Sequence, residues 1–138
     1  MNAFVDTNLL LYAAENDDTA GQKTAIAREL LLQPGLHISV QVLNEFIVNA
    51  RSPRKLALTA AGEADWIEKL LLYPVMSLTD RTFIRALELH QRYQTSHWDS
   101  LIIASALECR CEVLYSEDLN QGQDYGGVRV MNPFFDSE

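Results

Sequence analysis

Residues 3–14, AFVDTNLLLYAA, decide how the rest of the chain is interpreted. Ala3 to Val5 form an apolar run of the kind found in strands that are buried on both faces of a parallel sheet. The run stops at Asp6, and residues 8–15 already predict a short helix. An aspartate here is most often the cap of the following helix, because its carboxylate can accept hydrogen bonds from free N–H groups. A functional role for Asp6 is indicated only if other acidic side chains lie close to it in the fold.

Helical and strand patterns alternate through the rest of the chain. Strands joined by helices require parallel pairing, with right-handed crossovers and helices on both faces of the sheet. Thr59, Thr79 and Ser96 stand where helices begin and are candidate caps. Further helices are predicted over residues 20–32, 41–51, 58–72, 81–94 and 97–110, and further strands over residues 36–40, 73–79, 111–116 and 128–132.

Length and composition predict a single domain over residues 1–138, since 48% of the residues are hydrophobic and 22% are charged. The longest apolar stretches are far shorter than the ~20 residues that cross a bilayer, so no membrane partner is expected. No basic segment precedes an apolar one at the start, and a cytoplasmic location is therefore predicted.

The net charge of −8 argues against a protein that holds nucleic acid on a broad basic surface. It leaves room for an enzyme whose acids are concentrated in one site. Arg51, Arg54 and Lys55 form a local basic group within ARSPRK. We interpret these three as candidate substrate-binding residues, with plain solvated surface as the alternative.

Some of the candidate acids follow strands. Asp6 ends the first strand, and Glu117 and Asp118 follow the strand over residues 111–116. In open parallel sheets, function gathers beyond the carboxyl ends of the strands, where the strand order reverses. We therefore expect these acids at one edge of the sheet. Asp118 could also be a simple turn residue, and the sequence leaves open whether Glu117 or Asp118 faces the site.

Two further acids lie on predicted helices. Glu45 sits beside the apolar stripe of the helix over residues 41–51, where a glutamate is usually plain surface. Asp99 lies in the first turn of the helix over residues 97–110 and shares a face with Ile102 and Ala106. The helix dipole favours a carboxylate there, but a half-buried carboxylate also needs something positive to meet it.

Together, Asp6, Glu45, Asp99 and Asp118 predict a metal site. Carboxylates gathered without lysine or arginine partners repel each other, by on the order of 4 kcal/mol per pair at about 4 Å and an effective dielectric constant near 20. A hard divalent cation offsets this repulsion, and an all-oxygen ligand set selects Mg²⁺ or Mn²⁺. Such a cluster suits hydrolysis of phosphodiesters and requires neither histidine nor cysteine.

Five segments, in order, resemble PIN-domain proteins, and in particular VapC-like toxin ribonucleases. They are FVDTNLLLY (4–12), LNEF (43–46), HWDSLIIASA (97–106), LYSEDLNQG (114–122) and MNPF (131–134). The resemblance implies a Rossmann-like α/β/α sandwich with a five-stranded parallel sheet. It also implies an endoribonuclease that depends on Mg²⁺ or Mn²⁺, a small antitoxin protein as partner, and a homodimer.

Residue by residue, the resemblance places the four family acids on Asp6, Glu45, Asp99 and Asp118, with Glu117 competing for the fourth place. Asp6, Asp99 and the residue in that fourth place are expected to bind metal. Asn8 and Ser116 match supporting polar positions. The number of metal ions stays open.

Two other functions remain as alternatives. A PIN-fold module could bind nucleic acid without cleaving it. A phosphoacceptor receiver domain also collects acids at strand ends, but the last predicted strand, VRVMNPF, supplies no lysine. P-loop ATPases are excluded because the chain has no G-x-x-x-x-G-K, and Ser-His-Asp hydrolases because it has no nucleophile elbow.

Overall fold

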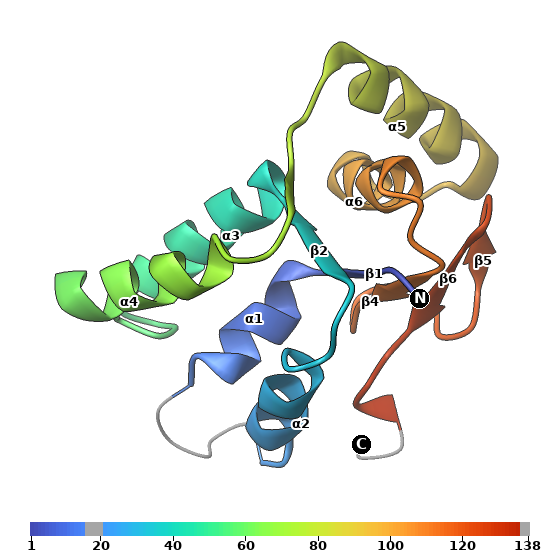
Figure 1. The fold of residues 1–138 in the computed structure, drawn as a ribbon. Coiled ribbons are helices and arrows are strands. Elements are labelled where there is room, and N and C mark those ends of the chain that lie inside the picture. Colours follow the sequence, from blue (N-terminus) through green and yellow to red (C-terminus); the bar gives the residue numbers. More distant parts are fainter. Residues whose placement is uncertain (16–20, 136–138) are drawn as a thin grey trace.

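The computed structural model describes residues 1–15 and 21–135 (Figure 1). This part of the chain forms six helices and six strands. In order they are β1 (Ala3–Val5), α1 (Thr7–Ala13), α2 (Lys23–Leu30), β2 (Leu36–Ser39), α3 (Val40–Arg51), α4 (Ala60–Leu70), β3 (Val75–Met76), α5 (Asp80–Tyr93), α6 (His97–Glu108), β4 (Val113–Tyr115), β5 (Asp124–Tyr125) and β6 (Val128–Met131).

The sheet has the strand order β3-β2-β1-β4-β6-β5. β1 pairs in parallel with β2 on one side and with β4 on the other, so the strand order reverses at β1. Val5 lies opposite Tyr115, and the Asp6 N–H donates to the Tyr115 carbonyl at 3.0 Å. Asp6 and Ser116 therefore leave the sheet side by side, at the carboxyl ends of neighbouring strands.

The predicted α/β class is confirmed, and the sheet contains one strand more than the five predicted. Strand β5 lies inside the segment assigned to a loop and pairs antiparallel with β6. Gly126 and Gly127 have φ of 67° and 121° and form the two-residue turn between Tyr125 and Val128. Asp124 Oδ1 accepts a hydrogen bond from the Gly127 N–H at 2.7 Å and closes the turn. β3 is also shorter than the predicted 73–79.

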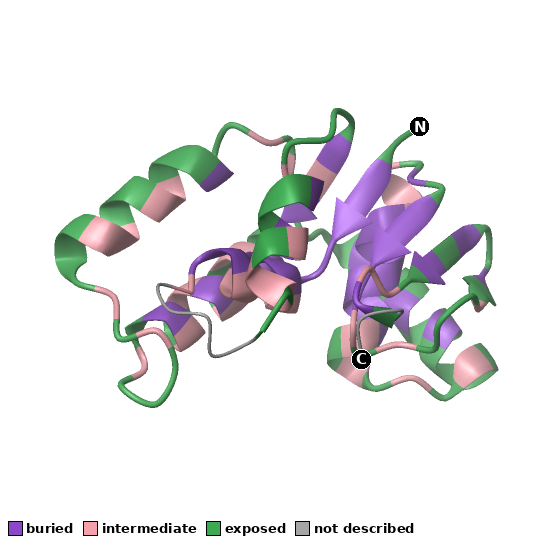
Figure 2. Ribbon diagram, turned by 90° about the horizontal axis from the view of Figure 1, so that it is seen from below, coloured by how far each residue is buried: buried purple, intermediate pink, exposed green. Residues whose placement is uncertain are grey.

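Helices cover both faces of the sheet. In Figure 1, α1 and α2 lie on one face, α5 and α6 lie on the other, and α3 and α4 extend beyond the carboxyl ends of β1 and β2. Every residue of α6 from Ser100 to Ala106 is buried, as are all of β1 and β4 (Figure 2). The α6 sequence LIIASA is apolar nearly all round because α6 lies between the sheet and α5.

Hydroxyl side chains cap four of the helices. Thr59, Thr79 and Ser96 accept hydrogen bonds from the first turns of α4, α5 and α6, which confirms the predicted caps. Ser39 caps α3 in the same way and fixes the start of the helix that carries Glu45. Within the described ranges, no helix is both long enough and apolar enough to cross a membrane.

Candidate active site

A cleft of about 300 Å³ opens beyond the carboxyl ends of β1 and β4. Four carboxylates reach it from four different parts of the fold: the end of β1, α3, the first turn of α6 and the connection after β4. Among the described residues that line it, none is a lysine, an arginine or a histidine. The lining consists of Asp6, Thr7, Asn8, Leu11, Glu45, Asn49, Asp99, Ile102 and Asp118.

Asp6 has a structural role and a place in the cleft at the same time. Its Oδ1 accepts the Thr7 N–H at 2.7 Å and caps α1, while Oδ2 accepts the Ser116 hydroxyl at 2.8 Å. The pKa of Asp6 is raised to about 7, chiefly by burial and also by the nearby Asp118 and Glu45 carboxylates, while its hydrogen bonds with Ser116 and Thr7 oppose this rise. The two interpretations of Asp6 offered by the sequence are therefore compatible.

Glu45 is held over the cleft by two donors. Its Oε1 accepts the Thr7 hydroxyl at 2.6 Å, and its Oε2 accepts the Gln41 amide at 3.1 Å. The same Gln41 amide nitrogen donates to the Trp98 carbonyl at 3.1 Å, which ties α3 to the start of α6. Glu45 is thus an anchored cleft residue rather than plain helix surface. The sequence reasoning missed Thr7 and Gln41, although Gln41 stands one helical turn before Glu45.

Asp99 and Asp118 complete the acidic lining. Asp99 lies in the first turn of α6, where its N–H donates to the Ser96 hydroxyl at 3.1 Å. Asp118 stands at the rim, and its N–H donates to the Ser116 hydroxyl at 3.2 Å. Partial burial raises the pKa of Asp118, and the carboxylates of Asp99 and Glu117 add to the rise.

Glu117 does not line the cleft. Its carboxylate accepts the Tyr12 hydroxyl at 2.7 Å and forms a salt bridge with the Lys23 ammonium. The structure therefore brings Asp118 together with the other three acids and directs the Glu117 side chain to α1 and α2.

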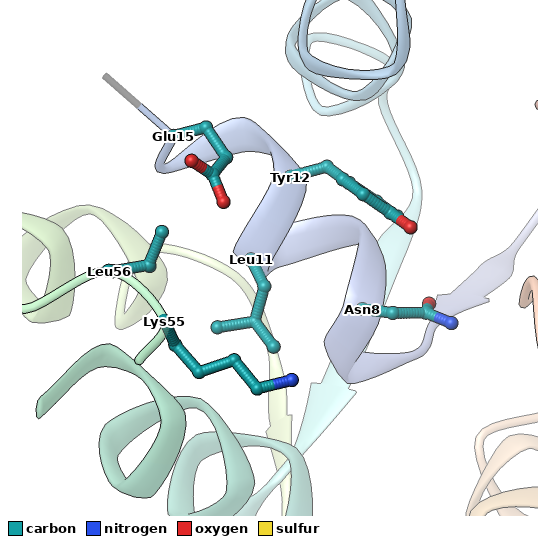
Figure 3. A pocket seen from close by; sticks show the side chains of 6 residues that line it. All are labelled: Asn8, Leu11, Tyr12, Glu15, Lys55 and Leu56. Carbon is teal, nitrogen blue, oxygen red and sulfur yellow. The ribbon is translucent and has the colours of Figure 1, made fainter. Parts of the chain in front are cut away.

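The three basic residues singled out from the sequence have different surroundings. Arg51 forms two hydrogen bonds with Glu63, at 3.0 and 2.7 Å, and Arg54 is exposed. Lys55 lines a second cavity, of about 160 Å³, together with Asn8 and Leu11, which also line the acidic cleft. Figure 3 shows the Lys55 side chain passing below Leu11, with its ammonium on the side of Asn8. Of the three, Lys55 is the one that lines a cavity adjoining the acidic cleft.

The oxygen atoms that line the cleft are of the kind that bind a hard divalent cation. Carboxylate and amide oxygens gather there with no cationic side chain among the described lining residues. Both polar atoms of the Asn8 amide are buried, and neither has a hydrogen bond of ordinary geometry within the described part of the chain. In residues 1–15 and 21–135, no group of three or more acidic, histidine or cysteine side chains is already arranged around an ion position. Ligation would therefore need rotation of side chains, which the exposed Asp118 and partly exposed Asp99 permit.

The protein is an α/β protein with a mixed sheet, and its acidic cleft lies where the strand order reverses. A family model described as the PIN domain matches residues 3–123. The chain belongs to the PIN-domain family.

Solved structures share the fold over most of their length. A toxin–antitoxin complex from Klebsiella pneumoniae is 24% identical, with a TM-score of 0.68, over 96% of this chain and 98% of that chain. VapC20 of Mycobacterium tuberculosis, described as a sarcin–ricin-loop cleaving toxin, is 19% identical, with a TM-score of 0.67, over 85% and 90%. DNA-bound VapBC from Salmonella typhimurium is 18% identical, with a TM-score of 0.69, over 96% and 98%. A sequence comparison with curated proteins gave no match.

Proposed function

We propose that this protein is an endoribonuclease that depends on Mg²⁺ or Mn²⁺ and acts as the toxin of a toxin–antitoxin pair. The observation that carries the proposal is the convergence of Asp6, Glu45, Asp99 and Asp118 on one cleft, whose described lining residues include no basic side chain. The PIN-domain fold and its VapC neighbours support the same class of activity.

Each acid has a role in this proposal. Asp6, Asp99 and Asp118 would hold the ion, which would supply Lewis-acid stabilisation of charge on the scissile phosphate. Glu45, oriented by Thr7 and Gln41, is the group that we assign to taking a proton from the attacking water. Ser116 keeps Asp6 in place from the end of β4.

The position of Lys55 supports a nucleic-acid substrate. Its ammonium lines the cavity that adjoins the acidic cleft, where it can meet a backbone phosphate next to the one that is cleaved. Since Arg51 is already engaged with Glu63, we assign the main phosphate contact to Lys55 and a lesser one to the exposed Arg54.

An antitoxin partner is the second part of the proposal. Two of the structural neighbours are described as a toxin–antitoxin complex and as VapBC. A groove of about 430 Å³ shares Glu45 and Asn49 with the acidic cleft and exposes Val48 and Trp98, so a protein that entered the cleft could also bury apolar side chains there. We also propose a homodimer, on the family resemblance alone.

Cleavage of RNA in the presence and absence of metal tests the enzymatic proposal. We expect cleavage with Mn²⁺ or Mg²⁺, none in EDTA, and loss of activity in the Asp99→Asn variant. Asp65→Asn, which removes an exposed acid of α4, is the matched control and should stay active. Cleavage that persists in EDTA would contradict the metal mechanism, and RNA binding without cleavage would favour the non-catalytic module.

The neighbouring reading frame tests the antitoxin proposal. We expect a short upstream gene whose product has a DNA-binding N-terminus, co-purifies with this chain and suppresses the cleavage. A purified neighbour that leaves cleavage unchanged would contradict the pairing.

A further inference from the structure

Next to the acidic cleft, side chains from four segments meet around the Lys23 ammonium. The ammonium forms a salt bridge with Glu117 and lies 5.1 Å from the ring centroid of Tyr12 and 5.4 Å from that of Phe134. The two rings meet edge to face at 5.1 Å, and the Tyr12 hydroxyl donates to Glu117 at 2.7 Å. The cluster thus joins α1, α2, the connection after β4 and the chain beyond β6.

The cluster holds Glu117, the middle residue of the turn over residues 116–118, which also carries Asp118 of the acidic cleft. Ser116, Glu117 and Asp118 follow one another directly after β4. Ser116 donates to Asp6 and accepts from the Asp118 N–H, and Asp118 lines the cleft. Glu117 lies between these two residues in sequence and is bound to α1 and α2 instead. The direction of the Glu117 side chain therefore constrains the two residues that serve the site.

The contacts are of kinds that fix a side chain firmly. The side chains of Lys23 and Glu117 are only 25% and 18% exposed, so solvent and salt screen their interaction less than that of a surface pair. A charge-assisted hydrogen bond is about twice as strong as a neutral one. Contact of the ammonium with two aromatic rings adds a cation–π attraction. Phe134 is fully buried, which anchors the cluster in the core.

We propose that Lys23, Tyr12 and Glu117 form a positioning clamp for the acidic site. The clamp fixes the turn over residues 116–118, so that Ser116 and Asp118 face Asp6, and it withdraws Glu117 from the metal ligands. Lys23, Tyr12 and Glu117 are positioning residues that act through Asp118. This inference rests on the function proposed above, and it assigns the fourth acid of the site to Asp118.

The test uses Lys23→Met, Glu117→Gln and the double variant. Methionine keeps the apolar contact with the two rings and removes the charge. We expect each single variant to weaken Mn²⁺ binding and to lower kcat, by about 10-fold for Lys23→Met, which is the range seen when groups that orient metal ligands are lost. The double variant should lose less than the product of the two single losses, because both changes break one interaction. Lys23→Arg should restore most of the loss.

Lys69→Met is the matched control, because Lys69 also lies over an aromatic ring, 4.9 Å from the Trp66 centroid on α4, but does not line the cleft. It should leave Mn²⁺ affinity and kcat unchanged. All measurements are made well below the melting temperature of every variant, with Mn²⁺ affinity determined by titration calorimetry. A lower melting temperature for Lys23→Met with unchanged Mn²⁺ affinity and kcat would overturn the proposal, because it would reduce the cluster to packing.

A second result would also overturn it. If Glu117→Gln abolishes Mn²⁺ binding as completely as Asp118→Asn while Lys23→Met does not change it, Glu117 is itself a ligand. Absence of RNA cleavage by the wild-type protein would contradict the proposed function instead. In that case two measurements still decide whether the clamp exists. They are the Mn²⁺ affinities of the variants and the difference between the melting-temperature change of the double variant and the sum of the changes of the two single variants.

Discussion

Ser116 donates a hydrogen bond to Asp6 across 110 residues of sequence, with 2.8 Å between Oγ and Oδ2. Both side chains are buried, Ser116 completely and Asp6 to within 5% of full burial. The bond joins the ends of β1 and β4, the two neighbouring strands at which the order of the sheet reverses. The same hydrogen bond therefore holds two strand ends together and lowers the pKa of a carboxylate in the cleft.

Removal of this bond should change how metal binding depends on pH. Ser116→Ala removes a hydrogen bond that opposes the rise in the pKa of Asp6, so this pKa should rise beyond its wild-type value of about 7. We expect weaker Mg²⁺ binding at pH 7 and recovery toward the wild-type affinity as pH rises, because a larger fraction of Asp6 is then ionised. Titration calorimetry at several pH values measures this. Ser105→Ala is the control, because the Ser105 hydroxyl is buried and has no hydrogen-bond partner among the described residues. A loss of affinity that is equal at every pH would contradict the explanation.

The stability of the metal-free protein should fall as pH rises. The folded-state pKa of Asp6 is raised from 3.8 to about 7, so the folded state disfavours the ionised form. Stability is then lost between about pH 4 and pH 7, by up to ~4 kcal/mol at ~1.4 kcal/mol per pKa unit. Asp6→Asn cannot ionise and keeps an oxygen that can cap α1. In EDTA, urea unfolding should show this variant to be more stable than the wild type at pH 8 and similar to it at pH 4.5. If the difference is the same at both pH values, Asp6 acts only as a cap.

Added metal should stabilise the wild-type protein more than variants of the cleft. Binding to the folded state contributes RT ln(1 + [L]/Kd), or ~2.7 kcal/mol at a hundred times Kd. Thermal melts with and without Mn²⁺ should show a clear rise in melting temperature for the wild type and a much smaller one for Asp6→Asn and Asp99→Asn. Asp65→Asn should respond as the wild type does. An equal rise in all four proteins would place the ion somewhere else.

Lys55 should affect the binding of RNA and leave the chemical step alone. Lys55→Ala removes the ammonium beside the cleft, so KM should rise while kcat changes little. The slope of log K against log salt should fall by about 0.7 if a single-stranded phosphate contact is lost. Arg54→Ala should act in the same direction but less, and Arg51→Ala chiefly through loss of the contact with Glu63. Arg85→Ala on the exposed face of α5 is the control. An unchanged KM for Lys55→Ala would return this residue to plain surface.

The sequence predicted the fold class and a cluster of acids at one edge of the sheet, for a physical reason. Parallel strands deliver their carboxyl ends to one edge, so Asp6 and an acid after β4 were expected to meet there. Glu45 and Asp99 follow from the helices that begin at the same edge. The strand β5 was missed because it is two residues long, although Gly126-Gly127 between Tyr125 and Val128 is a hairpin signal.

The choice between Glu117 and Asp118 could not be made from the sequence. It depends on Lys23, which is 94 residues away on α2, and on the rings of Tyr12 and Phe134 around its ammonium. These contacts cannot be inferred from the local sequence SEDLNQG. The role of Thr7 beside Glu45 is hidden for the same reason, since 38 residues separate them.

Helix α4 is attached to the rest of the molecule by little buried surface (Figure 2). Of its eleven residues, all within the described part of the chain, only Leu70 is buried. Its other ties to α3 include the contact of the Phe46 and Trp66 rings, 6.3 Å apart, and the exposed ion pair of Arg51 and Glu63. The amide protons of α4 should therefore exchange with solvent long before those of the fully packed α6. Lys55 lies in the connection that leads into this helix, so the surface proposed to meet RNA would be able to adapt to the shape of its ligand.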